Sequence, residues 1–267
     1  MLFSGCMFMT PYKVNEKNKK VVVYSVLFFV FILLLTLYFC VASFVTSYGY
    51  GQAMKAREYE KQVLTSLSEP KIFTVVIDPG HGGEDPGAVA NGVIEKHLDL
   101  SIGLKLGEFL NLSASDVVLT RTEDILLYEP GQEKRKKFYD LRNRLELAQG
   151  VPNGVYVGIH MNKFPIEKYF GLQTFYSDNN PKSRVFADII QETCRLVDPE
   201  NNRKIKPDGN TIFILENIEI PAILIECGFL SNYREAMLLA DEGYQKKLAF
   251  LIFCGVEKFL YEESQTS

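Results

Sequence analysis

Histidines are scarce in this chain, and two of the three stand where strands should end. His81 and His160 each follow a run of β-type apolar residues, and a third such run stops at Ile225 and is followed by Glu226. Open α/β sheets bind ligands at the carboxyl ends of their strands. We therefore predict that two imidazoles and a carboxylate gather at one edge of a sheet, as a hydrolytic metal site requires.

The loop around His81 is built from turn-forming residues. It reads DPGHGGEDPGA and closes before Glu95, which stands at the expected start of a helix and is a second potential metal ligand. Its glycines permit tight turns around a ligand: Gly80, Gly82, Gly83, Gly87 and Gly92. Glycine-rich turns also hold phosphates or simply reverse the chain, and an early-turn glutamate can merely complement the helix dipole.

The elements that must position these residues alternate between strand and helix patterns. This alternation predicts an α/β fold, a mostly parallel twisted sheet flanked by helices on both faces. We expect strands over 74–77, 117–119, 155–159, 171–176 (possible as an edge), 212–215 and 222–225, and helices from Glu95, over 141–148, from Pro181, over 233–239 and over 244–260.

The N-terminal region differs from this body. Residues 21–45 are uncharged, and as a helix they would extend about 37 Å, enough for a hydrocarbon core of about 30 Å. A cleavable signal usually has a shorter apolar core, so we predict an uncleaved transmembrane helix. Four lysines and one glutamate give residues 1–20 a charge of +3, which predicts an N-in, C-out orientation with an extracytoplasmic body.

These patterns divide the chain into five parts. We expect a basic cytoplasmic tail (1–20), the anchor (21–45), a stalk ended by Pro70 (46–71), a catalytic domain (72–262) and a short tail (263–267). Since the whole chain carries −4, the part after residue 20 carries −7. An acidic body argues against nucleic acid as a partner.

Five motifs carry a resemblance to a known family. In order they are DPGHGGEDPGA, GVIEKHLDL, LTRTED, GIHMN and AILIECGFLSN. Over about residues 72–262 they resemble the zinc-dependent N-acetylmuramoyl-L-alanine amidases, which cut the peptide stem from peptidoglycan. GLQTFYS, NRKIKP, the single-domain length and the anchor are most similar to the germination-specific type, which would imply a step toward muramic δ-lactam in the spore cortex and a location in the forespore intermembrane space.

The resemblance assigns roles at the site. It implies that His81, Glu95 and His160 bind Zn²⁺ and leave one coordination position for water, as in catalytic zinc sites. Glu226 would take a proton from the attacking water and return it to the departing amine of L-alanine. No tight cysteine cluster offers the structural alternative.

Four further residues have weaker assignments. Arg121 is either a surface cation in a turn or a contact to the site or to substrate carboxylates, and Arg144 matches a family position. Asn162 is expected to order the loop after His160 by bonding to backbone. His97 departs from the family pattern. We interpret it as exposed to solvent or as a neighbour of the metal ligands that does not itself bind the metal. The cations of NNRKIKPDGN either meet an anionic substrate or belong to a solvated turn.

Two other functions remain open at this point. One is a zinc peptidase of cell-wall stem peptides, and the other is a wall-binding protein that keeps the fold without catalysis. Because no separate wall-binding module is evident, an accessory protein that helps the enzyme engage its substrate is a further hypothesis.

Overall fold

The structure is a computed structural model that describes residues 16–66 and 72–265. The chain divides into two units between residues 69 and 70, and each is described by itself. Most of the predicted basic tail, the predicted helix end at Pro70 and the last two residues lie outside the described ranges.

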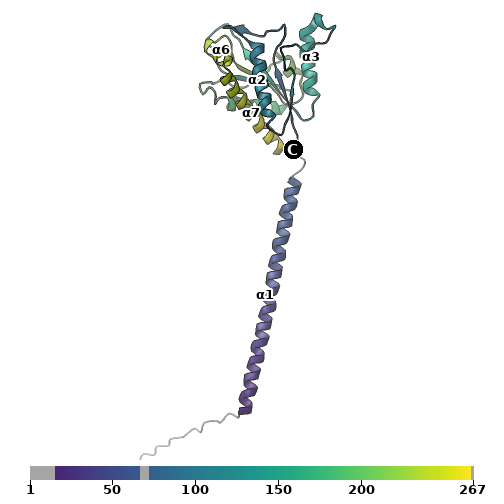
Figure 1. Ribbon diagram of the computed structural model, residues 1–267, viewed down its shortest axis with the longest axis vertical. Coiled ribbons are helices and arrows are strands. Elements are labelled where there is room, and N and C mark those ends of the chain that lie inside the picture. The colour runs from purple at the N-terminus through teal and green to yellow at the C-terminus, as the bar shows by residue number, and fades with distance from the viewer. Residues whose placement is uncertain (1–15, 67–71, 266–267) are drawn as a thin grey trace, which may run out of the picture. The chain divides into compact units, whose positions relative to one another are not determined.

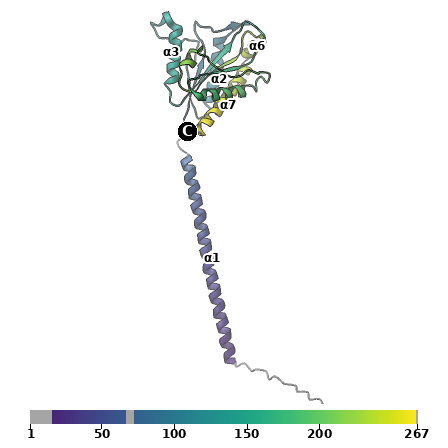
Figure 2. The ribbon, with the colours of Figure 1, turned by 180° about the vertical axis from the view of Figure 1, so that it is seen from behind.

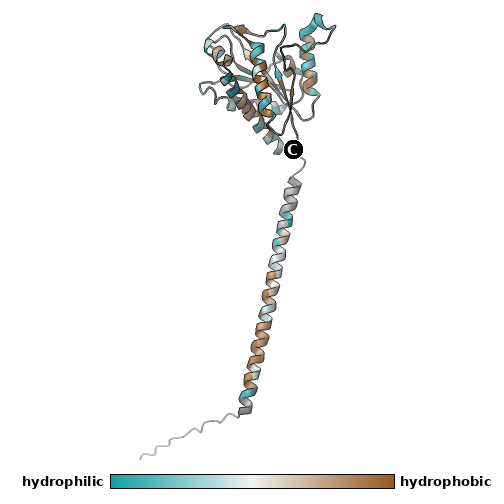
Figure 3. Cartoon of the chain, in the orientation of Figure 1, coloured by the Kyte–Doolittle hydropathy of each residue, from teal (hydrophilic) through white to brown (hydrophobic). Residues whose placement is uncertain are grey.

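The first unit is one helix, α1 (Glu16–Ser66), of 51 residues. At 1.5 Å per residue it is about 76 Å long. Its apolar side chains are exposed around the helix and gather in the N-terminal half (Figure 3). The segment Lys19–Lys55 is long and apolar enough to cross a membrane, a property that an anchor shares with a signal sequence. The expected boundary between anchor and stalk falls inside this continuous helix.

The second unit is the predicted α/β fold (Figures 1 and 2). Its sheet has the order β4-β1-β5-β8-β6-β7, in which every neighbouring pair is parallel except β6 with β8. A two-stranded hairpin, β2-β3, lies apart from this sheet. The strands are β1 (Thr74–Pro79), β2 (Val89–Ala90), β3 (Val93–Ile94), β4 (Asp116–Leu119), β5 (Gly154–Asn162), β6 (Gln173–Tyr176), β7 (Lys206–Pro207) and β8 (Ala222–Phe229). The helices are α2 (Glu95–Leu110), the 3-10 turn η1 (Glu133–Arg135), α3 (Lys136–Gln149), α4 (Pro181–Cys194), α5 (Phe213–Asn217), α6 (Tyr233–Ala240) and α7 (Glu242–Gln265).

Helices cover both faces of the sheet because strand side chains alternate between them. On one face, Val75 and Ile77 of β1 belong to a large core with apolar residues of α2, α4 and α7. On the other, Val76 of β1 and Tyr156 of β5 pack in a smaller core with α3 and α5. The central strands are therefore apolar on both sides, which is why they read as continuous hydrophobic runs.

Three sequence expectations need correction. The run 212–215 is not a strand: Phe213–Asn217 forms α5, which buries Ile214 and Leu215. A short apolar run does not distinguish a buried strand from a buried helix turn. The strand near residue 173 is not the edge, because the two-residue β7 pairs with its outer side. This β7 lies within the segment expected to be only a loop.

Candidate metal centre

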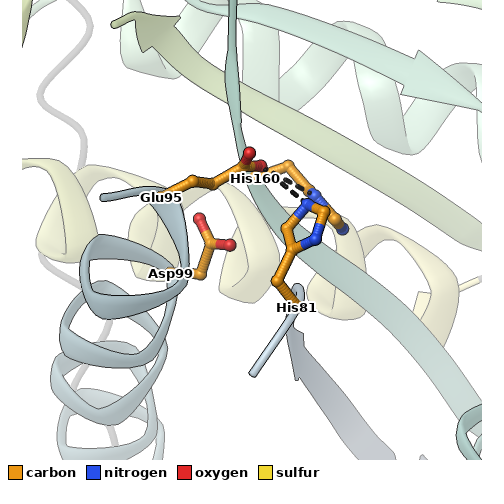
Figure 4. Close-up of side chains that lie close together, drawn as sticks. All are labelled: His81, Glu95, Asp99 and His160. Atoms are coloured by element: carbon orange, nitrogen blue, oxygen red, sulfur yellow. Dashed lines mark hydrogen bonds and ion pairs between the residues drawn. The ribbon is translucent and has the colours of Figure 1, made fainter. Parts of the chain in front are cut away.

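The structure brings three predicted ligands together at the carboxyl end of the sheet. His81 follows β1, Glu95 is the first residue of α2, and His160 lies in β5. Oε1 of Glu95 is 3.2 Å from Nε2 of His81 and 3.1 Å from Nδ1 of His160. The two imidazoles stand edge to face, with ring centroids 5.0 Å apart (Figure 4). One carboxylate oxygen thus faces a nitrogen of each ring.

Two glycines make this convergence sterically possible. A Cβ on Gly80 would lie 2.2 Å from Cε1 of His160, and one on Gly87 would lie 2.5 Å from Oε2 of Glu95. His81 itself adopts a left-handed backbone with φ of 58°, which is uncommon for a residue with a side chain. Such strained conformations cluster at functional sites.

Backbone donors fix the Glu95 carboxylate. The Met161 amide donates to its Oε1 at 3.0 Å, and the Ala88 amide donates to its Oε2 at 2.5 Å. Burial opposes the charge, but hydrogen bonding and attraction from His160 and His81 outweigh it and hold the pKa of Glu95 far below its usual range. Glu95 is therefore ionised and held in place, as a metal ligand must be.

The second nitrogen of His81 faces another carboxylate. Nδ1 of His81 is 3.0 Å from Oδ2 of Asp85, at ion-pair distance although without hydrogen-bond angles. Asp85 also accepts a hydrogen bond from the Gly87 amide and pairs with Lys137 at 3.0 Å. Burial raises the pKa of Asp85, yet His81 and Lys137 together lower it to about 2. This carboxylate can orient the ring so that Nε2 points to the site.

Arg121 and Arg144 hold the loop around His81 through hydrogen bonds to its main-chain carbonyls. The guanidinium of Arg121 donates to the carbonyls of Pro79 (2.9 Å) and Gly80 (2.7 Å), and that of Arg144 donates to the carbonyls of Pro79 (2.7 Å) and His81 (2.7 Å). Both side chains are buried, so Arg121 is not a surface cation. Their donors contact the protein's own backbone, which makes them supports of the loop.

A buried ion pair completes this support. Arg144 lies 2.6 Å from Asp78 and 3.0 Å from Asp140. Asp78 also accepts from the hydroxyls of Thr120 and Tyr156, both at 2.5 Å. Burial raises the pKa of Asp78, but the Arg144 charge and these hydrogen bonds together bring it below its usual range. The conformation of the metal loop therefore rests on a fully paired polar network.

Glu226 lies beside His160. The two residues are register partners in the parallel strands β5 and β8, so their side chains project from the same face of the sheet. Oε2 of Glu226 is enclosed and has no hydrogen-bond partner among the described residues. Burial raises the pKa of Glu226 to about 7, against the pull of His160. A carboxyl with such a pKa can both accept and return a proton near neutrality.

Sequence reasoning missed Asp99, which joins the same cluster. One ligand atom from each of His81, Glu95, Asp99 and His160 lies within 4.8 Å of the others (Figure 4). Asp99 comes one helical turn after Glu95, so the spacing of two carboxylates on one helix face was a readable signal. Burial, and then the Glu95 charge, raise the pKa of Asp99 well above its usual range.

The remaining predicted residues lie around the cluster. Asn162 ends β5, and its main-chain carbonyl accepts from the Leu230 amide at 2.8 Å, whereas we expected its side chain to bond. His97 is 56% exposed in its side chain and faces Asp124 at 3.7 Å, away from the cluster. Arg203 of the basic segment lies over the ring of Phe229, 4.3 Å from its centroid.

The donor set fits a divalent metal ion. Two imidazoles and the ionised carboxylate of Glu95 around a common centre are zinc ligands. Among the residues that the structure describes, both oxygens of Asp99 and Oε2 of Glu226 are buried without a hydrogen-bond partner. An α/β sheet whose strand ends hold such a cluster next to a buried carboxyl group is typical of a metal-dependent hydrolase.

Comparison with known proteins identifies the family. A family model described as N-acetylmuramoyl-L-alanine amidase (Amidase_3) matches residues 75–258. The chain therefore belongs to this family of zinc-dependent amidases, and its substrate is peptidoglycan. This confirms the family resemblance of the five motifs and the prediction of an N-acetylmuramoyl-L-alanine amidase.

Individual relatives show which members are similar. The germination-specific N-acetylmuramoyl-L-alanine amidase of Bacillus subtilis is 35% identical over 191 residues, which cover 71% of this chain and 80% of the relative. The CwlD amidase of Clostridioides difficile, solved in complex with the GerS lipoprotein, is 42% identical with a TM-score of 0.67 and covers 70% of this chain and 98% of that structure. The catalytic domain of CwlV from Bacillus (Paenibacillus) polymyxa is 31% identical with a TM-score of 0.62, over 71% of this chain and 98% of that structure.

Proposed function

We propose that His81, Glu95 and His160 hold zinc in this amidase and that Glu226 is its general base and acid. The observation that carries the proposal is the convergence of the three side chains on one centre beside Glu226, whose buried Oε2 has no hydrogen-bond partner within the described part of the chain. When bound there, zinc would supply the Lewis acid that activates water and polarises the scissile carbonyl.

The residues of the chain divide the proton transfers between them. Glu226 accepts a proton from the water whose oxygen attacks the lactyl carbonyl carbon. It then gives that proton to the nitrogen of L-alanine as the C–N bond breaks, which leaves a lactyl carboxylate and a free peptide amine. Asp85 orients the His81 ring, and Arg121 and Arg144 hold the loop that carries this ligand.

The test uses two variants with opposite expectations. Glu226→Gln should retain zinc and lose about 10²–10⁴-fold in turnover, because the amide cannot accept the proton. His81→Ala should lose zinc by elemental analysis while its circular dichroism stays close to that of wild type. Turnover near wild type in Glu226→Gln, or full zinc content in His81→Ala, would each remove the corresponding role.

Product analysis separates the amidase from a stem peptidase. Mass spectrometry of digested muropeptides should show a free amine on L-alanine and an intact stem. An amine on a residue further along the stem would indicate a peptidase of cell-wall peptides.

The biological substrate is proposed to be spore cortex, on the path to muramic δ-lactam. The similarity to a germination-specific amidase and to CwlD supports this. Deleting the gene in its host should remove δ-lactam from cortex muropeptides, and complementation with Glu226→Gln should not restore it. Normal δ-lactam in the deletion strain would contradict a cortex role.

An accessory protein is proposed to help this enzyme engage its substrate. CwlD of C. difficile was solved with the GerS lipoprotein, which supports a lipoprotein partner of similar kind. Isolated full-length enzyme should cleave purified cortex slowly, and lipoproteins co-purified from sporulating cells should accelerate it. Full activity of the isolated enzyme would make the partner unnecessary.

We further propose that α1 is an uncleaved N-in, C-out anchor that places the catalytic domain outside the cytoplasm, in the forespore intermembrane space. The lysines before its apolar part support this orientation. In intact cells, protease should digest the domain but leave the N-terminal tail. A mature protein that begins after residue 45 would show instead that α1 is removed.

A further inference from the structure

Asp99 carries a buried carboxyl group that is unpaired in the part of the chain that the structure describes. Its exposed fraction is 0%, and neither Oδ1 nor Oδ2 has a hydrogen-bond partner among the described residues. A carboxyl group that is unpaired in a protein interior is destabilising when it is neutral and far more so when it is charged. Ionised or protonated, this group therefore needs a partner, and residues 16–66 and 72–265 do not supply one.

Its position shows where that partner would lie. Asp99 follows Glu95 by four residues on α2, so both carboxyl groups project from one face of the helix. Figure 4 shows the Asp99 carboxyl directed toward the space between Glu95 and the imidazoles. A ligand oxygen of Asp99 is within 4.8 Å of the ligand atoms of the other three.

The nearby cations are occupied elsewhere. Arg121 gives its donors to the carbonyls of Pro79, Gly80, Lys96 and Glu123. Arg144 is bound to Asp78, to Asp140 and to loop carbonyls. Neither guanidinium donates to Asp99, so the attraction it feels from them is long-range only.

We propose that Asp99 is a fourth protein ligand of the metal ion. This inference rests on the proposed ligand set and extends it to two histidines and two carboxylates. The four ligand atoms lie within 4.8 Å of one another, so side-chain adjustments would bring them to one ion. An ion held by these four side chains would still supply the Lewis acid for the attacking water.

The second carboxylate has a chemical consequence. Two anionic ligands neutralise the charge of a divalent ion. Carboxylate oxygens also suit harder ions such as Mn²⁺ better than imidazole nitrogens do. Asp99→Asn should therefore weaken Mn²⁺ binding more than Zn²⁺ binding. This readout does not depend on catalysis.

The first test measures metal affinity of the full-length protein in detergent by competition with a chelator. Asp99→Asn should bind Zn²⁺ at least about 10-fold more weakly, because even loss of an outer partner costs about 10–100-fold. The matched control is Glu108→Gln, on an exposed position of the same helix, which should bind as wild type. Affinity within twofold of wild type in Asp99→Asn would overturn the proposal and leave a buried water as the partner.

A second variant gives a positive signal and covers a folding failure of the first. Cobalt-loaded Asp99→Cys should show a near-ultraviolet thiolate-to-cobalt charge-transfer band that is absent from wild type and from Glu108→Cys. Absence of the band in a folded, cobalt-loaded Asp99→Cys would also overturn the proposal. If His81→Ala retains its metal, the proposed site itself fails; if His81→Ala loses it and the Asp99 variants behave as wild type, only the role of Asp99 fails.

Discussion

Gly80→Ala is the sharpest steric perturbation of the metal centre. The added methyl would lie 2.2 Å from Cε1, 2.5 Å from Nε2 and 2.6 Å from Nδ1 of His160. Non-bonded carbon atoms are comfortable at about 3.5–4.0 Å. The His160 ring must therefore move by more than about 1 Å, because the clashing atom is the first atom of the new side chain and cannot rotate away.

The expected loss of metal follows from that displacement. Metal–ligand bonds tolerate about 0.2 Å, so a shift of about 1 Å removes one imidazole from the ion. We expect zinc affinity to fall by at least about 100-fold, which is about 2.8 kcal/mol. Overpacking should cost the metal-free fold a further 1–3 kcal/mol, roughly.

Chelator competition and urea unfolding measure the two effects separately. Gly92→Ala is the matched control: Gly92 has φ of 76° and nothing within 4 Å of an added Cβ. It should lose about 1–2 kcal/mol of stability through backbone strain and keep its zinc. Wild-type zinc affinity in Gly80→Ala would refute the close approach of the His160 ring to the loop.

Three further predictions concern the supports of the site. Asp85→Asn should weaken zinc binding about 10-fold or more, because the His81 ring is no longer held in its orientation. The control Glu84→Gln, at an exposed neighbouring position, should bind zinc as wild type does. Equal zinc affinities of the two variants would contradict the orienting role of Asp85. Arg144→Ala should lower the free energy of unfolding in urea by about 3–5 kcal/mol, because it leaves the buried Asp78 without its ion-pair partner. The control Arg142→Ala, which breaks an exposed ion pair, should lower it by less than about 1 kcal/mol. Similar losses in the two variants would refute the supporting role of Arg144. In metal-free protein, burial raises the Glu226 pKa from 4.5 to about 7, so the fold binds a proton that the unfolded chain releases, and stability falls as pH rises across this window. The loss of stability relative to Glu226→Gln is at most about 3.5 kcal/mol, because the pKa rises from 4.5 to about 7 and each pKa unit is worth about 1.4 kcal/mol. Parallel pH curves for the two proteins would show that the pKa of Glu226 is not raised.

Local patterns located the metal ligands because each marks an abrupt change in the chain. His81 and His160 follow strong β-type runs, and Glu95 follows a glycine-rich loop, so strand ends and a helix start could be read directly. The fold class followed from the alternation of the same runs. Convergence was predictable since parallel strands share one carboxyl edge.

What the sequence concealed depends on contacts between distant segments. Arg121 looked like a turn cation because its partners, the carbonyls of Pro79 and Gly80, lie about forty residues earlier in the chain. Asp99 looked like one polar residue of a helix, and only its burial against the cluster reveals that it lacks a partner. The helix at 213–217 replaced a predicted strand because a run of this length is apolar in either state.

The two arginines that hold the loop around His81 affect the order in which folding and metal binding occur. Because Arg121 and Arg144 tie the loop carbonyls to the sheet without help from a metal, the entropy of ordering the ligands is already spent when the polypeptide folds. Zinc fingers, by contrast, fold only on loading. We therefore expect the loop around His81 to be ordered in the metal-free protein, so that zinc binds to a site that is already folded.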